Sequence, residues 1–348
     1  MSNFKSHRLK LPVLAMVFFA LSTVASAQVK EQVLYSFQGG GTGLSRPVGR
    51  IVFDGTGNLY GTTQYGPGQG SVYQLARPAK LGDPWTETIL YTFQGKPVND
   101  GQIPSSGLLI DKMGNLYGVT AYGGAGNCIL LGILSGCGIV YELSPPAQKG
   151  GAWTETILYS FQGGTDGDLP FGDLTWDANG NLYGATQYGG GYGSCNAPFF
   201  QYCGTIFKLS APATQGGAWT EQVLYSFKGG TDGANPNGGL IFDPKGKMYG
   251  TTSWGGSTTN CVYTGFVGCG TVFRLKPSSG GGVAGGRALP FPGLSHRRSG
   301  PQRESDFAIR DSLRHYTRWR QPGVWPHLSA CTGRKKRGRL ERDLHSRV

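Results

Sequence analysis

One pattern occurs four times along the chain and constrains its fold more than any other feature. The third copy starts at Trp153 and reads Trp-Thr-Glu-Thr-Ile-Leu-Tyr-Ser-Phe, then Thr-Asp-Gly, Gly-Asn-Leu-Tyr-Gly-Ala-Thr and Cys-Gly-Thr-Ile-Phe-Lys-Leu. One tyrosine can be aligned in all copies: Tyr60, Tyr117, Tyr183 and Tyr249. These tyrosines lie 57, 66 and 66 residues apart. Self-similarity at a fixed period indicates a repeat architecture.

Each repeat contains four short segments rich in Val, Ile, Leu, Tyr, Phe and Thr, separated by Gly, Asn, Asp or Pro. This is the pattern of antiparallel strands joined by turns, and four strands per unit is typical of a propeller blade. We therefore predict an all-β, β-propeller-like domain of four-stranded antiparallel blades over residues 28–277. Its repeats are expected at about residues 31–80, 85–145, 153–211 and 219–277. A linear solenoid is the alternative.

The order of strands within a blade follows from the position of the inner strand, which we place at Gly239 to Asp243. The Trp-Thr-Glu strand then ends each blade. The segment Glu31 to Phe37 is left as an outer strand without a blade of its own. It is expected to complete the last blade and to close the ring, because closure removes exposed sheet edges.

The N-terminus has the order of a secretory signal peptide. Lys5, Arg8 and Lys10 precede an apolar run over residues 11–25, and small residues follow as far as Ala27. We predict a signal peptide over residues 1–27 and a secreted or extracytoplasmic protein. A retained anchor is disfavoured because the apolar run is shorter than the ~20 residues that span a bilayer, so no transmembrane segment is expected in the mature chain.

Six of the seven cysteines occur as pairs at one place in the repeat, between the second and third strands. The pairs are Cys128 with Cys137, Cys195 with Cys203, and Cys261 with Cys269. In an exported chain this pattern predicts three local disulfide bonds. Zinc binding is the alternative, but no histidine lies near any pair.

The composition changes abruptly after about residue 278. Residues 281–348 hold 13 of the 18 arginines and contribute +10 of the formal net charge of +12. A one-base shift of the underlying codons can encode Trp-Arg-Glu-x-Val-Leu-Tyr-x-Phe across residues 283–291, in register with the repeat. We therefore interpret residues 278–348 as a frameshifted fifth repeat, which leaves a non-native or disordered, protease-sensitive basic tail. A genuine basic tail is the alternative, and no nucleic-acid partner is predicted.

The repeated motifs Val/Ile-Leu-Tyr-Ser-Phe, Thr-Asp-Gly, Gly-Asn-Leu-Tyr-Gly-Thr-Thr and Cys-Gly-Thr-Val-Phe-x-Leu resemble the GloVer tandem-repeat family of exported bacterial proteins. The resemblance covers about residues 31–277. It implies a secreted or surface-displayed protein, usually with a variable C-terminal anchor and without an assigned activity. It defines no functional residues that could be transferred to this chain.

Catalytic chemistry has little support in the repeats. Residues 28–277 contain no histidine, which excludes His-dependent nucleophilic triads there. One aspartate per repeat lies in a turn and is expected to be structural: Asp54, Asp111, Asp177 and Asp243. Three glutamates alternate with Thr on the outer strand and are expected on a solvated edge: Glu87, Glu155 and Glu221. We predict no catalytic residue, no metal site and no cofactor.

Four aromatic residues precede the Gly-Gly turns and are the candidate ligand-binding residues: Tyr65, Tyr122, Tyr188 and Trp254. A ring of aromatic faces would suit stacking on sugars, whereas packing between blades is the simpler interpretation. The function predicted from the sequence is an extracytoplasmic binding or structural module, with a glycan or a cell-surface protein as partner. The alternative is a polysaccharide-acting enzyme on a propeller scaffold.

Overall fold

The aromatic and β-branched segments of the repeats form strands in the structure, a computed structural model. It describes residues 31–40, 43–80, 82–130, 133–191, 195, 203–214, 216–256, 262–263, 266–277, 283–284 and 289–290. Four antiparallel sheets are arranged as a four-bladed β-propeller. The prediction of an all-β propeller is therefore confirmed, and the chain does not form a linear solenoid.

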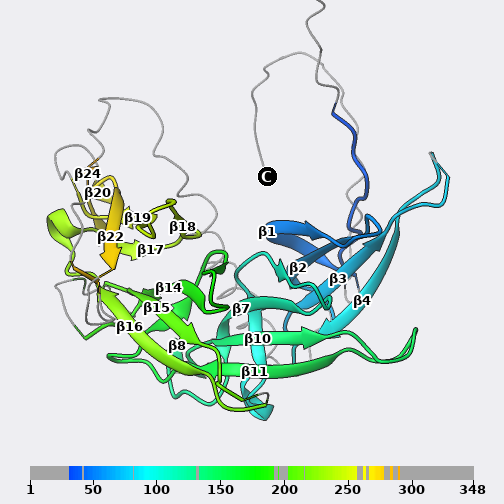
Figure 1. Cartoon of the computed structure of the whole chain (residues 1–348), viewed down its shortest axis with the longest axis horizontal. Helices are drawn as coiled ribbons and strands as arrows, with labels where there is room; N and C mark the ends of the chain where they lie inside the picture. Colours follow the sequence, from blue (N-terminus) through cyan, green and yellow to red (C-terminus); the bar gives the residue numbers. More distant parts are fainter. Residues whose placement is uncertain are drawn as a thin grey trace, which may run out of the picture. The chain divides into compact units, whose positions relative to one another are not determined.

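Blade 1 consists of β1 (Ser45–Phe53), β2 (Leu59–Tyr65), β3 (Ser71–Ala76) and β4 (Thr86–Thr92), paired in chain order. In the other blades the innermost strand is divided in two. Blade 2 contains β5 (Gly101–Pro104), β6 (Leu109–Ile110), β7 (Leu116–Gly123), β10 (Ile139–Ser144) and β11 (Thr154–Ser160). Blade 3 contains β12 (Asp168–Pro170), β13 (Thr175–Trp176), β14 (Leu182–Tyr188), β15 (Thr205–Ser210) and β16 (Thr220–Ser226). Figure 1 shows these strands side by side within each blade.

Blade 4 contains β17 (Ala234–Pro236), β18 (Ile241–Phe242), β19 (Met248–Trp254), β22 (Thr271–Pro277), β23 (Val283–Ala284) and β24 (Leu289–Pro290). Two short hairpins lie in the loops between second and third strands: β8 (Ile129–Leu130) with β9 (Ile133–Leu134), and β20 (Val262–Tyr263) with β21 (Phe266–Val267). Two 3₁₀ turns, η1 (Lys96–Val98) and η2 (Gly230–Asp232), precede blades 2 and 4.

The predicted strand order within a blade is confirmed, because the Trp-Thr-Glu segments form the last strands β4, β11 and β16. The segment predicted to close the ring does not form a strand, since residues 31–39 have no regular secondary structure. In blade 4 the outer position is occupied instead by β23 and β24, which pair with β22. These strands follow β22 after a short connection, so the entropic cost of bringing them together is small.

The structure also adds a part of the inner strand that the sequence interpretation missed. Four segments begin the blades, and each contains a left-handed residue directly before a proline: Arg46, Ile103, Leu169 and Asn235, with φ between 54° and 58°. A left-handed conformation is uncommon for residues other than glycine. In three of them the backbone N–H donates across the blade junction, from Ile103 to Gln69, from Leu169 to Cys137 and from Asn235 to Cys203.

Aromatic side chains fill the junctions between blades. Tyr117 of blade 2 meets Trp176 of blade 3 with ring centroids 4.9 Å apart. Phe161, at the end of the blade 2 outer strand, lies 5.1 Å from Phe207 of blade 3. The same two contacts recur at the next junction, where Tyr183 meets Phe242 and Phe227 meets Phe273. Edge-to-face pairs of this kind stabilise the junctions beyond the burial of their area.

In the middle of the inner strands, blades 1, 2 and 3 meet. Arg50 of β1 donates through Nη2 to the carbonyl of Leu174 at 3.1 Å, and its Nε lies 3.7 Å from Asp173 Oδ2. Asp173 Oδ1 accepts from the backbone N–H of Gly107 at 2.7 Å. A Cβ at Gly107 would lie within 2.3 Å of the Arg50 backbone, so only glycine leaves room for this contact.

The signal peptide predicted at residues 1–27 lies outside the described residues, as does most of the predicted tail at 278–348. The chain divides into two units, residues 1–36 and 37–348, and all the strands belong to the second. In the part of the chain that the structure describes, no helix is long and apolar enough to cross a membrane.

Candidate functional site

The turn aspartates at Asp54, Asp111, Asp177 and Asp243 have the structural role predicted for them. Asp54 Oδ1 accepts from the backbone N–H groups of Thr56 and Asn58, and its Oδ2 accepts from the Tyr60 hydroxyl at 3.0 Å. The other three copies repeat the tyrosine bond. Burial opposes ionisation, but the hydrogen bonds prevail and lower the pKa of Asp54. These carboxylates are committed to their turns.

A second repeated aspartate lies at each blade junction. The tyrosine of an outer strand donates its hydroxyl proton to the aspartate of the turn that follows: Tyr91 to Asp100, Tyr159 to Asp166 and Tyr225 to Asp232. The same aspartates accept a backbone N–H, as Asp166 does from Gln162. The Thr-Asp-Gly segments are thus turns, as the sequence indicates, and their carboxylates face the neighbouring blade.

The glutamate of the next outer strand joins this aspartate, and at the junction of blades 1 and 2 the group is closed. Tyr91 donates to Asp100 Oδ2 at 3.2 Å and also approaches Glu155 Oε2 at 3.1 Å. Burial, and then the Asp100 carboxylate, raise the pKa of Glu155 to about 8. The expectation that Glu155 lies on a solvated edge is wrong, because the adjacent blade covers it.

The equivalent group between blades 2 and 3 is open. Tyr159 commits its hydroxyl to Asp166 at 2.7 Å, and Glu221 Oε1 is buried without a hydrogen-bond partner among the described residues. Burial and then Asp166 raise the pKa of Glu221 to about 8. Burial also raises the pKa of Asp166, against the hydrogen bonds from Gln162 and Tyr159. Glu155 Oε1 is likewise buried without a partner among the described residues. The two groups differ in the tyrosine contact, because Tyr91 reaches Glu155 whereas Tyr159 donates to Asp166.

A pocket of about 730 Å³ lies at this open junction. Its lining combines two acids, one cation, hydroxyl groups and an aromatic ring: Thr165, Asp166, Gly190, Glu221, Val223, Leu224, Tyr225, Ser226 and Lys228. The volume falls within the range of small-molecule sites. A carboxyl with a strongly raised pKa in a cleft is a physical indication of a functional site.

The aromatic residues predicted from the sequence lie elsewhere, each paired with a residue at the start of an inner strand. The register pairs are Ser45 with Tyr65, Gln102 with Tyr122, Asp168 with Tyr188 and Ala234 with Trp254. Tyr122, Tyr188 and Trp254 are 3%, 4% and 6% exposed, whereas Tyr65 is half-buried. Packing between blades accounts for the first three, since Tyr122 and Tyr188 share a core cluster with Ile103 and Leu169. Their role in sugar binding stays a prediction.

The matching sequence model is that of the Gloeobacter/Verrucomicrobia repeat, over residues 17–263. The chain belongs to this family. Among curated proteins, none matches this GloVer chain.

The repeats carry a sequence signal for the open site. The number of residues from the turn aspartate to the next outer-strand glutamate is constant. It is 55 residues both from Asp100 to Glu155 and from Asp166 to Glu221.

The comparison with solved structures finds distant similarity to several enzymes. An α-L-arabinofuranosidase from Clostridium thermocellum has a TM-score of 0.36 and 14% identity over 71% of this chain and 73% of its own. An ulvan lyase has a TM-score of 0.39 and 11% identity over 68% of this chain and 53% of its own. An arabinoxylan arabinofuranohydrolase of glycoside hydrolase family 43 from Bacillus subtilis has a TM-score of 0.40 and 14% identity. The match covers 71% of this chain and 50% of the enzyme. At these scores the similarity carries no inference about activity.

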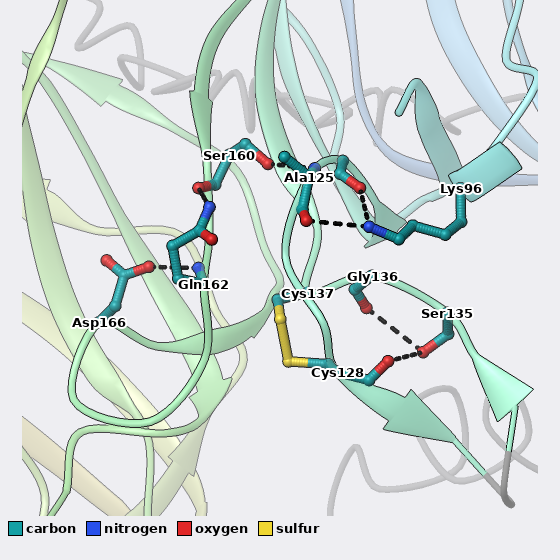
Figure 2. Close-up of a disulfide and its surroundings, with 10 residues drawn as sticks. Lys96, Ala125, Cys128, Ser135, Gly136, Cys137, Ser160, Gln162 and Asp166 are labelled. Carbon is teal, nitrogen blue, oxygen red and sulfur yellow. Dashed lines mark hydrogen bonds between the residues drawn. A yellow bond between two sulfur atoms is a disulfide. The ribbon is translucent and has the colours of Figure 1, made fainter. Parts of the chain in front are cut away.

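Disulfide bonds secure the loops beside the GloVer junctions. Two predicted pairs are confirmed, Cys128–Cys137 and Cys195–Cys203, with Cα atoms 5.1 and 5.2 Å apart. The third prediction cannot be followed because Cys261 lies outside the described residues. Figure 2 shows the first bridge near the turn that carries Asp166. Such bonds are typical of proteins in an oxidising, extracytoplasmic environment.

Glycine makes room for each bridge. A Cβ at Gly163 would lie 2.8 Å from Cys128 Sγ, and φ is +81° there. Both conditions exclude other residues without a shift of the backbone or the bridge. Cys137 is fully buried and shares a core cluster with Phe161. The bridge therefore belongs to the junction core, which rules out the zinc alternative for this pair.

Proposed function

We propose that this protein is an exported binding module that holds an oligosaccharide in the pocket between blades 2 and 3. The signal peptide expected at residues 1–27 would deliver it to the extracytoplasmic space, where the two disulfide bonds can form. The observation that carries the proposal is that Glu221, whose neighbour Tyr159 donates to Asp166 instead, lines a pocket of about 730 Å³ in the described part of the chain.

The polar groups of the pocket suit a ligand rich in hydroxyl groups. A protonated Glu221 can both donate and accept a hydrogen bond, as a sugar hydroxyl does. Lys228 supplies donors, and Thr165 and Ser226 supply hydroxyl groups. The Tyr225 ring offers an apolar surface, while its hydroxyl is already bound to Asp232. A small number of polar groups on a partly apolar wall is the usual composition of a ligand site.

A polysaccharide-acting enzyme is the second candidate, and one observation favours it. Burial and Asp166 raise the pKa of Glu221 to about 8, so the carboxyl holds its proton at neutral pH, as a general acid must. Asp166 lies on the same pocket and is tuned differently by the hydrogen bonds from Tyr159 and Gln162. Two carboxyls in different environments are the pattern of acid–base chemistry.

A glycan array probed with the purified protein tests both candidates. The binding module predicts saturable binding that Glu221→Gln weakens at least tenfold, with no change in the glycan after long incubation. Glu155→Gln, at the closed junction, is the matched control and should leave binding unchanged. Shortened products that disappear with Glu221→Gln would establish the enzyme instead. Binding that is identical in all three proteins would reject this pocket as the site.

A further inference from the structure

Four residues at the start of the inner strands form a separate group, which we call the axial positions: Ser45, Gln102, Asp168 and Ala234. Each is paired with the aromatic residue of its blade, and each is followed by the left-handed residue and the proline. The flanking prolines and aromatics repeat, whereas the axial residues differ in every blade. Of the four, only Asp168 carries a charge.

Asp168 lies among aromatic side chains and lacks a counterion in the described part of the chain. Its Oδ1 is buried and accepts no hydrogen bond there. The hydroxyl of Tyr122 is also buried without a partner among the described residues, in a side chain that is 3% exposed. Tyr188 faces Asp168 in the strand register and packs against Tyr122 and Leu169. Within the described residues, no lysine or arginine forms an ion pair with Asp168.

Arg46 directly follows the axial residue Ser45, but it interacts with Tyr65. Arg46 donates to the Tyr65 hydroxyl at 3.3 Å, and its guanidinium lies 5.3 Å from the centre of the Tyr65 ring. Tyr65, the aromatic residue paired with Ser45, thus already contacts one cation of the chain itself. Aromatic faces attract cations, and a desolvated carboxylate requires a positive partner or a proton.

We propose that the axial positions form a second binding site, in which Asp168 and the surrounding tyrosines hold the ammonium group of a small organic amine. One N–H would be donated to Asp168 Oδ1 and another to the Tyr122 oxygen, and both of these atoms lack a partner among the residues described. The ring of Tyr188 would face the cation. Asp168 is partly exposed as a residue, although its Oδ1 is buried.

A divalent metal fits this site less well than an amine. Calcium takes six to eight oxygen ligands and prefers several carboxylates. The axial positions offer one carboxylate, one hydroxyl and one amide, and the tyrosines paired with them add phenol oxygens. The cluster of Cys128, Cys137 and Asp168 is no metal site either, because its two sulfur atoms are joined in a disulfide bond.

Amine binding at this site should depend on pH. Burial raises the pKa of Asp168 to about 7, against the backbone hydrogen bond of Leu169. The groups beside it are the phenol of Tyr122, the paired residue Tyr188 and the disulfide bond between Cys128 and Cys137. Asp168, Tyr188 and Tyr65 in turn act on Tyr122. Burial and these acidic neighbours raise the pKa of Tyr122, so it stays neutral. Asp168 is therefore the group expected to titrate near neutral pH.

Methylammonium chloride serves as the probe, and thermal melting of the full chain as the readout. We expect the melting temperature to rise with methylammonium concentration, and the apparent affinity to increase about tenfold from pH 6 to pH 8, as one carboxyl of pKa near 7 loses its proton. Asp168→Asn should abolish the rise, and Tyr122→Phe should reduce it. Glu221→Gln, in the other pocket, should leave the rise unchanged, so this test is independent of the proposed oligosaccharide site.

Three results would overturn the proposal. Sodium chloride at the same ionic strength could raise melting equally, which would indicate a general salt effect. Calcium chloride at lower concentration could replace methylammonium, which would indicate a metal site. The rise could persist in Asp168→Asn when that variant melts cooperatively, which would place the amine elsewhere. Tyr122→Phe keeps the test decisive if Asp168→Asn fails to fold.

Discussion

Arg50 of the first blade and Asp173 of the third are joined across the inner strands, with Arg50 Nε 3.7 Å from Asp173 Oδ2. The second blade takes part through the backbone N–H of Gly107, which donates to the other oxygen of Asp173. Residues at the same place in the repeat are glycines in blades 2 and 4, Gly107 and Gly239. A repeat position therefore carries a cation, a glycine, an anion and a glycine in turn.

Replacing Asp173 separates the two contributions to this contact. Asp173→Ala removes the acceptor of the Gly107 N–H and is expected to lower the free energy of unfolding by about 1–2 kcal/mol. Asp173→Asn keeps an acceptor and loses only the ion pair, which is worth under about 1 kcal/mol because Arg50 is half exposed. Urea denaturation measures both. Equal losses in the two variants would contradict the assignment.

The junction glutamates should make the protein less stable in alkali. Their pKa values are raised to about 8 in the folded state, above the ordinary value near 4.5. The folded chain thus binds these protons more tightly than the unfolded chain, and the resulting stability is lost as the pH rises from about 4.5 through 8. Melting temperatures from pH 5 to pH 9 should fall more in the wild type than in Glu155→Gln/Glu221→Gln. An identical slope would show that these carboxyls do not titrate as described.

The left-handed residues before proline predict an unusual substitution pattern. Asn235 has φ of 58° and donates its backbone N–H to Cys203. A valine there is a conformational outlier, so Asn235→Val should cost about 1–3 kcal/mol of stability. Asn235→Gly should cost much less, because glycine adopts this conformation freely. Urea denaturation of the two variants compares these costs. If glycine proved as harmful as valine, lost side-chain contacts rather than backbone conformation would be the cause.

The disulfide bonds are expected to stabilise the fold substantially. They close short loops, with sequence separations of 9 and 8 residues. The loop-entropy model gives about 2–3 kcal/mol for each. Cys128→Ser/Cys137→Ser should therefore lower the denaturation midpoint, and a reducing agent should lower melting further by opening the second bridge. Unchanged melting after complete reduction, verified by thiol titration, would count against this role.

Much of the fold could be predicted because the repeat states it four times. The strands, the turns at Asp54 and its equivalents, and the confirmed cysteine pairs all follow from local pattern and spacing. The first half of each inner strand could not be predicted in this way. Proline in a segment argues against a strand, and the left-handed conformation of residues such as Ile103 cannot be recognised from residue type. The recurring proline itself was the available signal.

The candidate site was harder to predict for a different reason. Glu221 and Asp166 come from successive repeats, and each taken alone resembles a surface residue on a strand or in a turn. Only the packing of one blade on the next buries them together. Their difference from the Glu155 group depends on where a single tyrosine hydroxyl points. Contacts of that kind depend on distances of a few tenths of an ångström and have no counterpart in residue spacing.

The sequence repeat begins on an outer strand, whereas the blade begins on an inner one. Duplication of the repeated segment in the gene would therefore finish one sheet and open the next in the same event. After insertion or deletion of such a copy, the chain still starts and ends at the same points of the repeat. The fold can change its number of blades by whole steps during evolution without passing through a form that exposes an additional sheet edge.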